Sequence, residues 1–291
     1  MSSLKEIKGR IASVKSTQKI TSAMKMVASA NLRKAQSRIE GFLPYQRKLA
    51  EMFQAFVSSV TDFESNLKEE REIRRVAIVV FSSNSGLCGA FNSNILKLLK
   101  ETLLKYKHLP NDAIEIYPVG KKIEAQVRRM NLSYKIMGSY IEWMDKPDFS
   151  GAKTIANELI SNFLNKKIDK VELLYNHLKS AGVQVPTTEQ YLPVVLQPAD
   201  ANNLISIDYI VEPDKATILH SLLPKSLHSK VYAVALDSAA AEQAARVVAM
   251  QIATDNAGDL LDGLTIQYNK QRQQVITSEL LDIIGGSEAL K

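Results

Sequence analysis

The sequence is poor in the residues that build disulfides, metal sites and membrane spans. Cys88 is the only cysteine, which excludes an internal disulfide and a cysteine-based metal site. The four histidines, His108, His177, His220 and His228, show no metal-ligand spacing. No apolar run approaches the roughly 20 residues that a bilayer-spanning helix needs, and charges stand where a signal peptide would have its apolar core. We therefore expect a soluble cytoplasmic protein with no metal, no cofactor and no direct membrane span.

Acidic residues are scarce at the amino-terminal end. Between Met1 and Ala50 there are eleven lysines and arginines but only two acidic residues, Glu6 and Glu40. Such an asymmetry predicts an acidic partner. The segment lacks the interleaved aromatic residues and the known modules of nucleic-acid-binding proteins, so we do not expect nucleic acid to be that partner.

Glycine and proline are rare in two long terminal stretches, from Leu4 to about Val60 and from Pro213 to about Ile284. Their helix breakers are Gly9, Gly41, Pro44, Pro224, Gly258 and Gly263. Continuous helices of this size would be about 80 Å and about 105 Å long, which is typical of a coiled coil. The sequence therefore predicts a long antiparallel coiled coil made of an N-terminal helix (1–60) and a C-terminal helix (207–291).

Apolar or small residues recur in the N-terminal helix at close to heptad spacing. They are Leu4, Ile7, Ile11, Val14, Thr21, Ala28, Leu32, Ala35, Ile39 and Phe42. Gln18 and Lys25 fall on the same register and predict a weaker seam at mid-helix. There Ile20, Met24 and Val27 shift the apolar stripe sideways, so we expect the helix to change what it packs against.

The middle of the chain, residues 74–206, alternates short β-branched runs with helical patterns. We expect strands at 75–81, 113–119, 132–137 and 171–175, an extended segment at 183–195, and helices at 92–106, 121–130 and 152–165. This order predicts an inserted, Rossmann-like α/β domain with a mostly parallel sheet. Pro186 and Pro193 place the last strand at an edge of that sheet.

A glycine-containing turn, Ser85–Asn92, follows the first expected strand, where α/β enzymes often bind phosphates. It lacks the three-glycine dinucleotide fingerprint and the Gly-Lys-Ser/Thr ending of NTPases. Packing of the strand–helix junction is therefore the favoured interpretation, and nucleotide binding remains an alternative. Lys121 and Lys122 open the next helix, where basic residues oppose the helix dipole, and are candidates for a surface contact. No catalytic constellation stands out.

The residues at both ends resemble the signatures of ATP synthase gamma subunits. The N-terminal match is Ile11–Ala30 (IASVKSTQKITSAMKMVASA) followed by Arg33–Gln36 (RKAQ), and the central match is Gly86–Gly89 (GLCG) with Asn92. The C-terminal matches are Ala244–Arg246, Ala249–Met250, Ala253–Ala257 (ATDNA), Tyr268–Lys270, Arg272–Gln273 and Ile276–Leu280 (ITSEL). Asn84 and Ser85 depart from an Asp-Arg pair that the family often has, and Gly285-Gly286 replace its usual Gly-Ala, which is expected to loosen the last helical turn.

The resemblance implies a non-catalytic central shaft. Three alpha and three beta subunits would surround the two helices, with the catalytic sites on the beta subunits. The α/β domain would grip the membrane c-ring together with the epsilon subunit, at the cytoplasmic face of a bacterial inner membrane. Rotation would couple proton or sodium flow to ATP synthesis and hydrolysis. The alternatives are a coiled-coil adaptor and a nucleotide-binding enzyme. Co-purification distinguishes the three functions, because a shaft should recover a hexameric ATPase, an adaptor another protein, and an enzyme no obligatory partner.

The resemblance also implies partner contacts on both helices. Lys25, with Lys19 and Met24, would face acidic loops of the beta subunits, although a solvated lysine is the plain alternative. Arg246, Arg272 and Gln273 carry multidentate donors and resemble the hydrogen-bonding contacts of the family to the ring; helix surface polarity is their alternative. The tip would be a bearing of non-directional apolar contacts. Its candidate residues are Leu280, Leu281, Ile283, Ile284 and Leu290.

Overall fold

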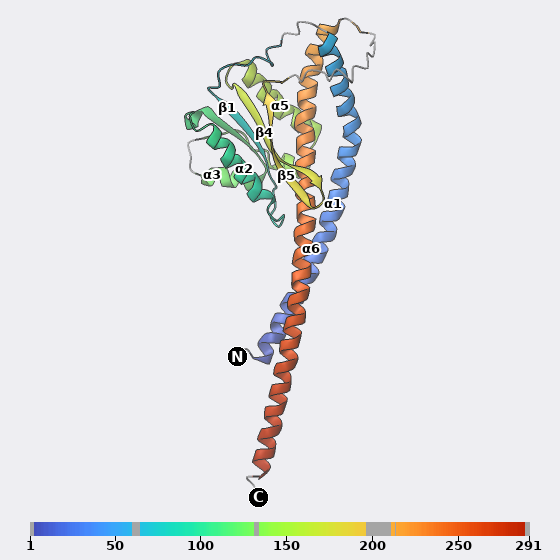
Figure 1. Cartoon of the computed structure of the whole chain (residues 1–291), viewed down its shortest axis with the longest axis vertical. Coiled ribbons are helices and arrows are strands. Elements are labelled where there is room, and N and C mark those ends of the chain that lie inside the picture. Colours follow the sequence, from blue (N-terminus) through green and yellow to red (C-terminus); the bar gives the residue numbers. More distant parts are fainter. Residues whose placement is uncertain (1–2, 60–64, 131–133, 196–210, 213, 289–291) are drawn as a thin grey trace. The chain divides into compact units, whose positions relative to one another are not determined.

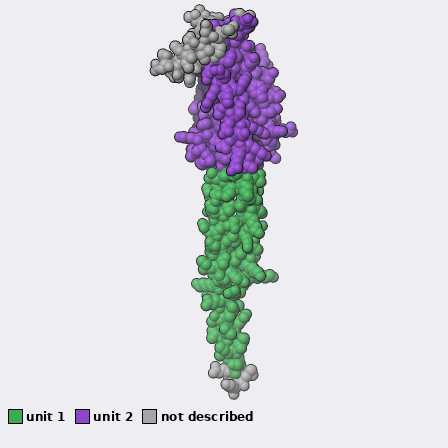
Figure 2. All heavy atoms as spheres, turned by 90° about the vertical axis from the view of Figure 1, so that its right-hand side faces the viewer, with its two compact units in different colours: residues 1–29, 246–291 green, residues 30–245 purple. Residues whose placement is uncertain are grey.

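The computed structural model describes residues 3–59, 65–130, 134–195, 211–212 and 214–288. The chain forms two compact units: unit 1 comprises residues 1–29 and 246–291, and unit 2 comprises residues 30–245 (Figure 2). The domain boundaries expected above remain a prediction, because both units contain a part of each terminal helix.

Two long helices begin and end close to the predicted positions. They are α1 (Leu4–Ser59) and α6 (Lys215–Glu288) (Figure 1). Each contains an internal proline, Pro44 and Pro224 respectively, without an interruption of the helix. The helix α6 also continues through Gly285 and Gly286, so these glycines do not end it.

In unit 1 the two helices pack antiparallel. The hydroxyl oxygens of Thr21 and Thr254 lie 2.8 Å apart, and Lys25 Nζ donates to Gln251 Oε1 at 2.8 Å. Moving four residues forward along α1, from Thr21 to Lys25, thus moves the contact three residues backward along α6, from Thr254 to Gln251. The predicted antiparallel pairing is confirmed within this unit.

Unit 2 contains a five-stranded sheet with helices on both faces. Its elements between the long helices are β1 (Val76–Phe81), α2 (Phe91–Lys105), the 3-10 helix η1 (Asn111–Ala113), β2 (Ile114–Val119), α3 (Lys121–Arg129), β3 (Lys135–Ile136), α4 (Ile141–Asp145), α5 (Phe149–Leu164), β4 (Lys170–Ser180) and β5 (Val183–Leu192). The strand order is β3-β2-β1-β4-β5, with β1 to β4 parallel and β5 antiparallel. The predicted edge position of the proline-bearing strand is confirmed.

Each face of the sheet has its own core because side chains alternate along every strand. Val76, Ile78 and Val80 of β1 point toward α2 and α3, whereas Ala77 and Val79 point toward the opposite face. That second face is covered by α5 and by the unit 2 parts of α1 and α6. Burial on both sides explains the continuous β-branched run of β1.

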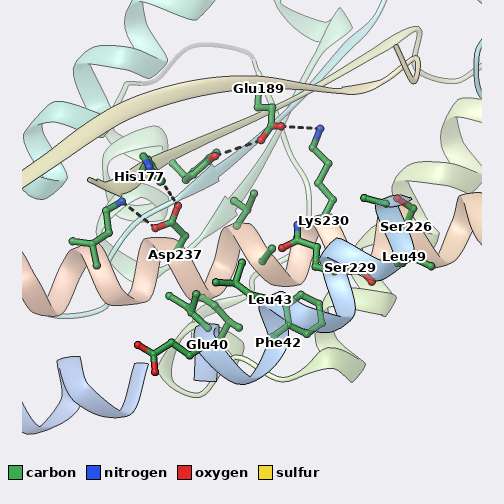
Figure 3. Close-up of a pocket in the computed structure, with 18 of the residues that line it drawn as sticks. Glu40, Phe42, Leu43, Leu49, His177, Glu189, Ser226, Ser229, Lys230 and Asp237 are labelled. Carbon is green, nitrogen blue, oxygen red and sulfur yellow. Dashed lines mark hydrogen bonds and ion pairs between the residues drawn. The ribbon is translucent and has the colours of Figure 1, made fainter. Parts of the chain in front are cut away.

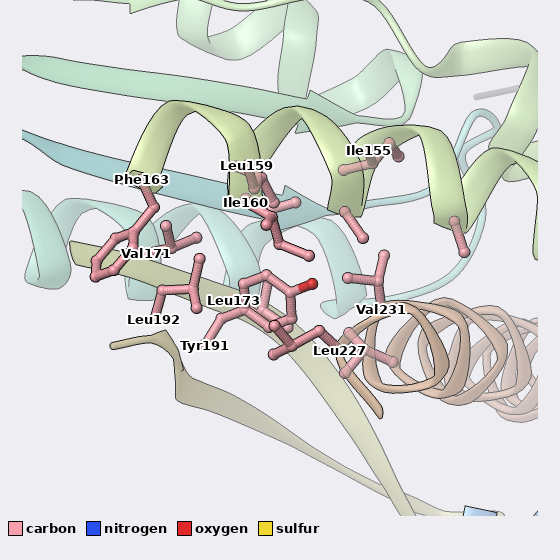
Figure 4. Packing of buried hydrophobic residues seen from close by; sticks show 14 of the residues in the cluster. Ile155, Leu159, Ile160, Phe163, Val171, Leu173, Tyr191, Leu192, Leu227 and Val231 are labelled. Atoms are coloured by element: carbon pink, nitrogen blue, oxygen red, sulfur yellow. The ribbon is translucent and has the colours of Figure 1, made fainter. Parts of the chain in front are cut away.

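The core on the second face joins α5 and α6 to the sheet. Leu159 and Phe163 of α5 pack with Leu173 of β4, Tyr191 of β5 and Leu227 of α6 (Figure 4). All five side chains are almost completely buried. The α/β domain and this part of α6 therefore share one core.

Four elements differ from the prediction. β4 continues five residues beyond the expected end at Tyr175, as far as Ser180, because β5 pairs with this extension. The helices α4 and η1 were not predicted. Of the weak strand expected at 132–137, the structure retains β3, while residues 132 and 133 lie outside the described residues.

Candidate functional site: an interaction surface on the long helices

The seam of unit 1 is continuous, and its polar members bond across it. Gln18 and Lys25 are partly buried and Thr21 is 9% exposed. Because Lys25 and Thr21 find the partners Gln251 and Thr254 on α6, they do not break the register that the apolar residues set. The seam therefore keeps its place where the sequence predicted a weak point.

The apolar residues expected to shift the stripe sideways are exposed. Ile20 is 52% exposed, Met24 40% and Val27 63%. Lys19 beside them is exposed as well. These residues form a separate apolar surface on α1 beside the seam, with a lysine next to it, and the expected change in what the helix packs against stays a prediction.

The last part of α6 carries a second apolar surface. Every residue from 272 to 287 is exposed. Ile276, Leu280 and Ile284 recur every four residues and so lie on one side of the helix, at 48%, 55% and 57% exposure. Leu281 and Ile283 are even more exposed, at 63% and 68%. Leu290, also expected at the tip, lies outside the described residues.

Arg272 and Gln273 lie together on α6, next to the apolar stripe. Both line a shallow hollow along the helix that also includes Ile276, and both are exposed. Their side chains are thus available to a partner. Arg246 differs, since it is partly buried and already engaged within the chain.

The glycine turn packs against α6 within unit 2. Cys88 and Phe91 are 1% and 2% exposed and form a cluster with Ala241 and Ala245, against which Leu178 packs. The alanines allow a close approach, as the sequence suggested, but the residues that approach include this turn and the start of α2. The favoured packing interpretation of the turn therefore agrees with its contacts.

Hydrogen bonds inside the turn fix its shape. The backbone N–H of Ser83 donates to Asn92 Oδ1 at 3.2 Å, and the Ser83 hydroxyl also bonds to the side-chain amide of Asn92. Asn92 Nδ2 also lies 3.1 Å from Cys88 Sγ. The amide of Asn92 thus bonds to the end of β1 instead of facing a ligand.

The N-terminus of α3, the second place where a phosphate could bind, is occupied by protein atoms. The backbone N–H of Lys121 donates to Asn84 Oδ1 at 2.8 Å, and that of Ile123 donates to Ser82 Oγ at 3.0 Å. The N–H of Lys122 between them donates to the carbonyl of Ser83 at 3.1 Å. Because an anion site at a helix start needs free N–H groups, this geometry argues against phosphate binding there.

Asn84 explains one departure from the family pattern. Besides capping α3, its Nδ2 donates to the carbonyl of Ile141 and to Asp145 Oδ1, both at 2.7 Å. Asn84 therefore ties the end of β1 to α3 and α4. Its role is to hold these elements together, and sequence reasoning missed it because α4 was not predicted.

The described part of the chain shows neither a metal-binding group nor a spanning helix. No cluster of three or more His, Cys, Asp or Glu side chains able to hold a metal occurs among these residues. None of the described helices combines the length and the apolar character that crossing a membrane requires.

Comparisons with known proteins agree on one family. A family model described as ATP synthase matches residues 3–290. The ATP synthase gamma chain of Azobacteroides pseudotrichonymphae is 56% identical over 292 residues and covers 100% of both chains. That of Bacteroides fragilis is 54% identical, covering 99% of this chain and 100% of its own.

Solved structures show the same fold. A chain in the central stalk and c-ring structure of Tetrahymena thermophila mitochondrial ATP synthase is 26% identical, with a TM-score of 0.58, and covers 80% of this chain and 99% of its own. A chain in a Euglena gracilis mitochondrial ATP synthase structure covers 99% and 94%, with 21% identity and a TM-score of 0.69. Together with the match of the family model and of the full-length relatives, this places the chain in the ATP synthase gamma chain family.

Proposed function

We propose that the chain is the central-stalk subunit of a bacterial ATP synthase. It rotates inside a hexamer of alpha and beta subunits and couples proton or sodium flow through the membrane c-ring to ATP synthesis and hydrolysis. The chain is non-catalytic, because the catalytic sites belong to the beta subunits. It binds the epsilon subunit and the c-ring, and it is peripheral to the cytoplasmic face of the inner membrane.

One observation carries this proposal: the apolar stripe of α6 is fully formed but uncovered. Ile276, Leu280 and Ile284 are each about half exposed on one side of a helix. A stripe of this kind normally faces another protein surface. Apolar contacts have no preferred direction, which suits a tip that turns within a ring of subunits.

Polar residues next to the apolar surfaces suit contacts that form and break during rotation. Arg272 and Gln273 are exposed and adjacent on α6, and both offer several donors to a ring subunit. Lys19 and Lys25 play the corresponding part on α1, next to the apolar Met24. Lys25 reaches Gln251 in the free chain, so its contact with an acidic loop requires this hydrogen bond to be exchanged.

A single shaft also has to treat three equivalent catalytic subunits differently. The α1 and α6 faces of unit 1 differ in their exposed residues, with Met24 and Lys19 on one helix and Arg272 and Leu280 on the other. Each ring subunit then meets a different face, and the differential contact favours a different conformation in each. An asymmetric shaft of this kind is what a rotary function requires.

The test is co-purification from the native host or from a reconstituted system. A tagged chain should recover alpha and beta subunits in a three-to-three complex with ATPase activity. Recovery of another protein in place of these subunits would support the adaptor alternative. ATP turnover by the isolated chain would support the enzyme alternative, and either result would refute the proposal.

A further inference from the structure

A pocket in unit 2 has no part in the proposed function. It has a volume of about 610 Å³ and lies between the second half of α1, the beginning of α6 and the β4–β5 hairpin (Figure 3). Ile39, Leu43 and Leu49 contribute apolar side chains from α1, and Val234 contributes one from α6. Its size is within the range of pockets that bind drug-sized molecules.

A buried hydroxyl lines this pocket without a hydrogen-bond partner. Ser229 is 1% exposed, and its Oγ bonds to no atom in the described part of the chain. Leaving a buried hydroxyl unpaired is unfavourable, unless a bound molecule supplies the missing bond. Ser229 is therefore a buried polar group that would orient a ligand inside the pocket.

Acidic side chains outnumber basic ones at the rim. Glu189 pairs with Lys230 at 2.9 Å, and Asp237 Oδ2 accepts from His177 Nδ1 at 2.6 Å (Figure 3). Glu40 adds a third carboxylate. Because Lys230 pairs with Glu189 and His177 with Asp237, Glu40 is the carboxylate that would attract a cation to the rim, although the whole chain has a net charge of +6.

Tyr175 keeps the inner wall neutral. Burial raises the pKa of its hydroxyl, and the charges of Glu189 and Asp237 raise it further. The hydroxyl donates to Glu189 Oε2 at 3.4 Å. Tyr175 thus adds a hydroxyl to the pocket lining without adding a negative charge.

We propose that this pocket binds a small amphiphilic amine. The apolar body fills the space between the helices and the hairpin, a polar group of the ligand bonds to Ser229, and the ammonium head lies at the rim near Glu40. Such a ligand contacts α1, α6, β4 and β5 at once, so it stabilises the association of the helices with the sheet in unit 2. This inference does not depend on assembly into an ATP synthase.

The test compares two probes of the same length and opposite charge on the full chain. Isothermal titration calorimetry should show saturable one-to-one binding of ω-aminodecanol, at least about tenfold tighter than that of ω-hydroxydecanoate, a difference of about 1.4 kcal/mol. Equal or tighter binding of the acid would overturn the proposal, as would binding of many copies without saturation.

Substitutions locate the site. Ser229→Ala should weaken binding of the amine about threefold to tenfold, since it removes one hydrogen bond, while thermal stability stays the same or rises. Ser238→Ala is the matched control: Ser238 is also buried on α6 with an unpaired hydroxyl, but it does not line the pocket. If the two substitutions weakened amine binding equally, the ligand would not bind at Ser229 as proposed.

Two further variants test separately the free volume of the pocket and the charge at its rim. Ala233→Trp should abolish binding by filling the pocket, with the fold checked by helicity and thermal unfolding. If this variant fails to fold, the comparison of Ser229→Ala with Ser238→Ala still tests whether the ligand binds in this pocket. Glu40→Gln should weaken the amine about fivefold and leave the binding of the acid no weaker, because only the amine interacts favourably with that charge. Unchanged amine binding in both Ala233→Trp and Ser229→Ala refutes the proposal.

Discussion

The two units use the same pair of helices in different ways. In unit 2 the side chains of α6 join a core with the sheet, and their buried members include Leu219, Leu222, Leu223, Leu227, Val231 and Val234. In unit 1 the buried apolar residues of α6 are Met250, Ala257 and Leu264, while Leu280 and Ile284 remain exposed. The difference indicates that unit 2 is completed within the chain, whereas unit 1 leaves apolar surface for other subunits to cover.

The composition of the seams agrees with this division. Within unit 1, Thr21 and Lys25 bond to Thr254 and Gln251 across the helix pair. Within unit 2, the rings of Phe42 and Tyr232 meet edge to face, 4.9 Å apart. Polar pairs contribute little net stability, while buried apolar area contributes most of it. We therefore expect unit 2 to dominate the stability of the free chain.

The largest expected effect is on the unit 2 core. Leu159→Ala removes a completely buried side chain and should lower the free energy of unfolding by about 2 to 5 kcal/mol. Leu280→Ala, at an exposed position of unit 1, should change it by less than about 0.5 kcal/mol. Urea unfolding followed by the fluorescence of Trp143, the single tryptophan, measures unit 2 directly. Helicity should be recorded in parallel to follow the helix pair.

A similar loss of unfolding free energy in Leu159→Ala and Leu280→Ala would contradict the difference between the two units. That outcome would mean that the C-terminal part of α6 packs within the free chain after all. The ATPase rate of the reconstituted complex supplies the converse test. Leu280→Ala should lower this rate although it hardly changes the free energy of unfolding of the free chain.

The second effect concerns the exposed polar pair. Replacing Arg272 and Gln273 together by alanine should leave helicity and thermal unfolding of the free chain intact. In a reconstituted complex, coupled ATP turnover and assembly yield should fall, because each lost hydrogen bond is worth about 0.5 to 3 kcal/mol, depending on whether a charged group takes part.

A matched control is the double variant Lys105→Ala and Lys107→Ala, which changes two exposed residues of unit 2. It should leave turnover unchanged. A large loss of helicity in the Arg272 and Gln273 variant would show that the pair is structural, and unchanged turnover and yield would show that it is solvated surface.

A third, smaller effect is expected from shortening α6. Deleting residues from Ile283 to the end removes part of the exposed apolar stripe, and an apolar bearing consists of many weak contacts. The complex should therefore still assemble, with a lower yield and a weaker hold on the tip. Gel filtration and subunit stoichiometry measure this, and complete failure to assemble would identify the tip as an anchor.

Lys25 tests the polar seam itself. Lys25→Met loses the bond to Gln251 but adds apolar contact, so thermal unfolding of the free chain should change by no more than about 1 kcal/mol. Coupled turnover of the complex should decrease if the charge faces an acidic loop. Lys15→Met, at an exposed position on the same helix, is the control and should leave turnover unchanged. Equal turnover in the two variants would favour a solvated lysine.

Periodicity predicted the elements well because it depends on neighbouring residues within one helix or strand. It failed where a distant segment decides the structure. Lys25 looked like a weak point in the seam because its partner Gln251 lies at the other end of the chain. β4 was expected to end at Tyr175, yet the polar residues beyond it extend the strand because β5 pairs with them.

The candidate site was predictable only in part for the same reason. Exposure of the apolar stripe at Leu280 and Ile284 follows from the greater length of α6 compared with α1. The pocket around Ser229 could not be predicted, because its walls come from three separated segments. The residues of other subunits that would meet Arg272 are encoded in other chains, so this contact stays a prediction.

The smallest expected effect is none at all: the free chain should not bind ATP in the micromolar range. A nucleotide would have to displace Asn84 and Ser82 from the N–H groups at the start of α3, and the turn around Cys88 is packed against Ala241. Both losses oppose binding, since buried polar groups left unpaired are costly. Equilibrium dialysis with ATP and Mg²⁺ measures this. Stoichiometric, tight binding would contradict the packing interpretation of the turn and revive the enzyme alternative, whereas Asn84→Ala should lower the stability of unit 2 without creating a nucleotide site.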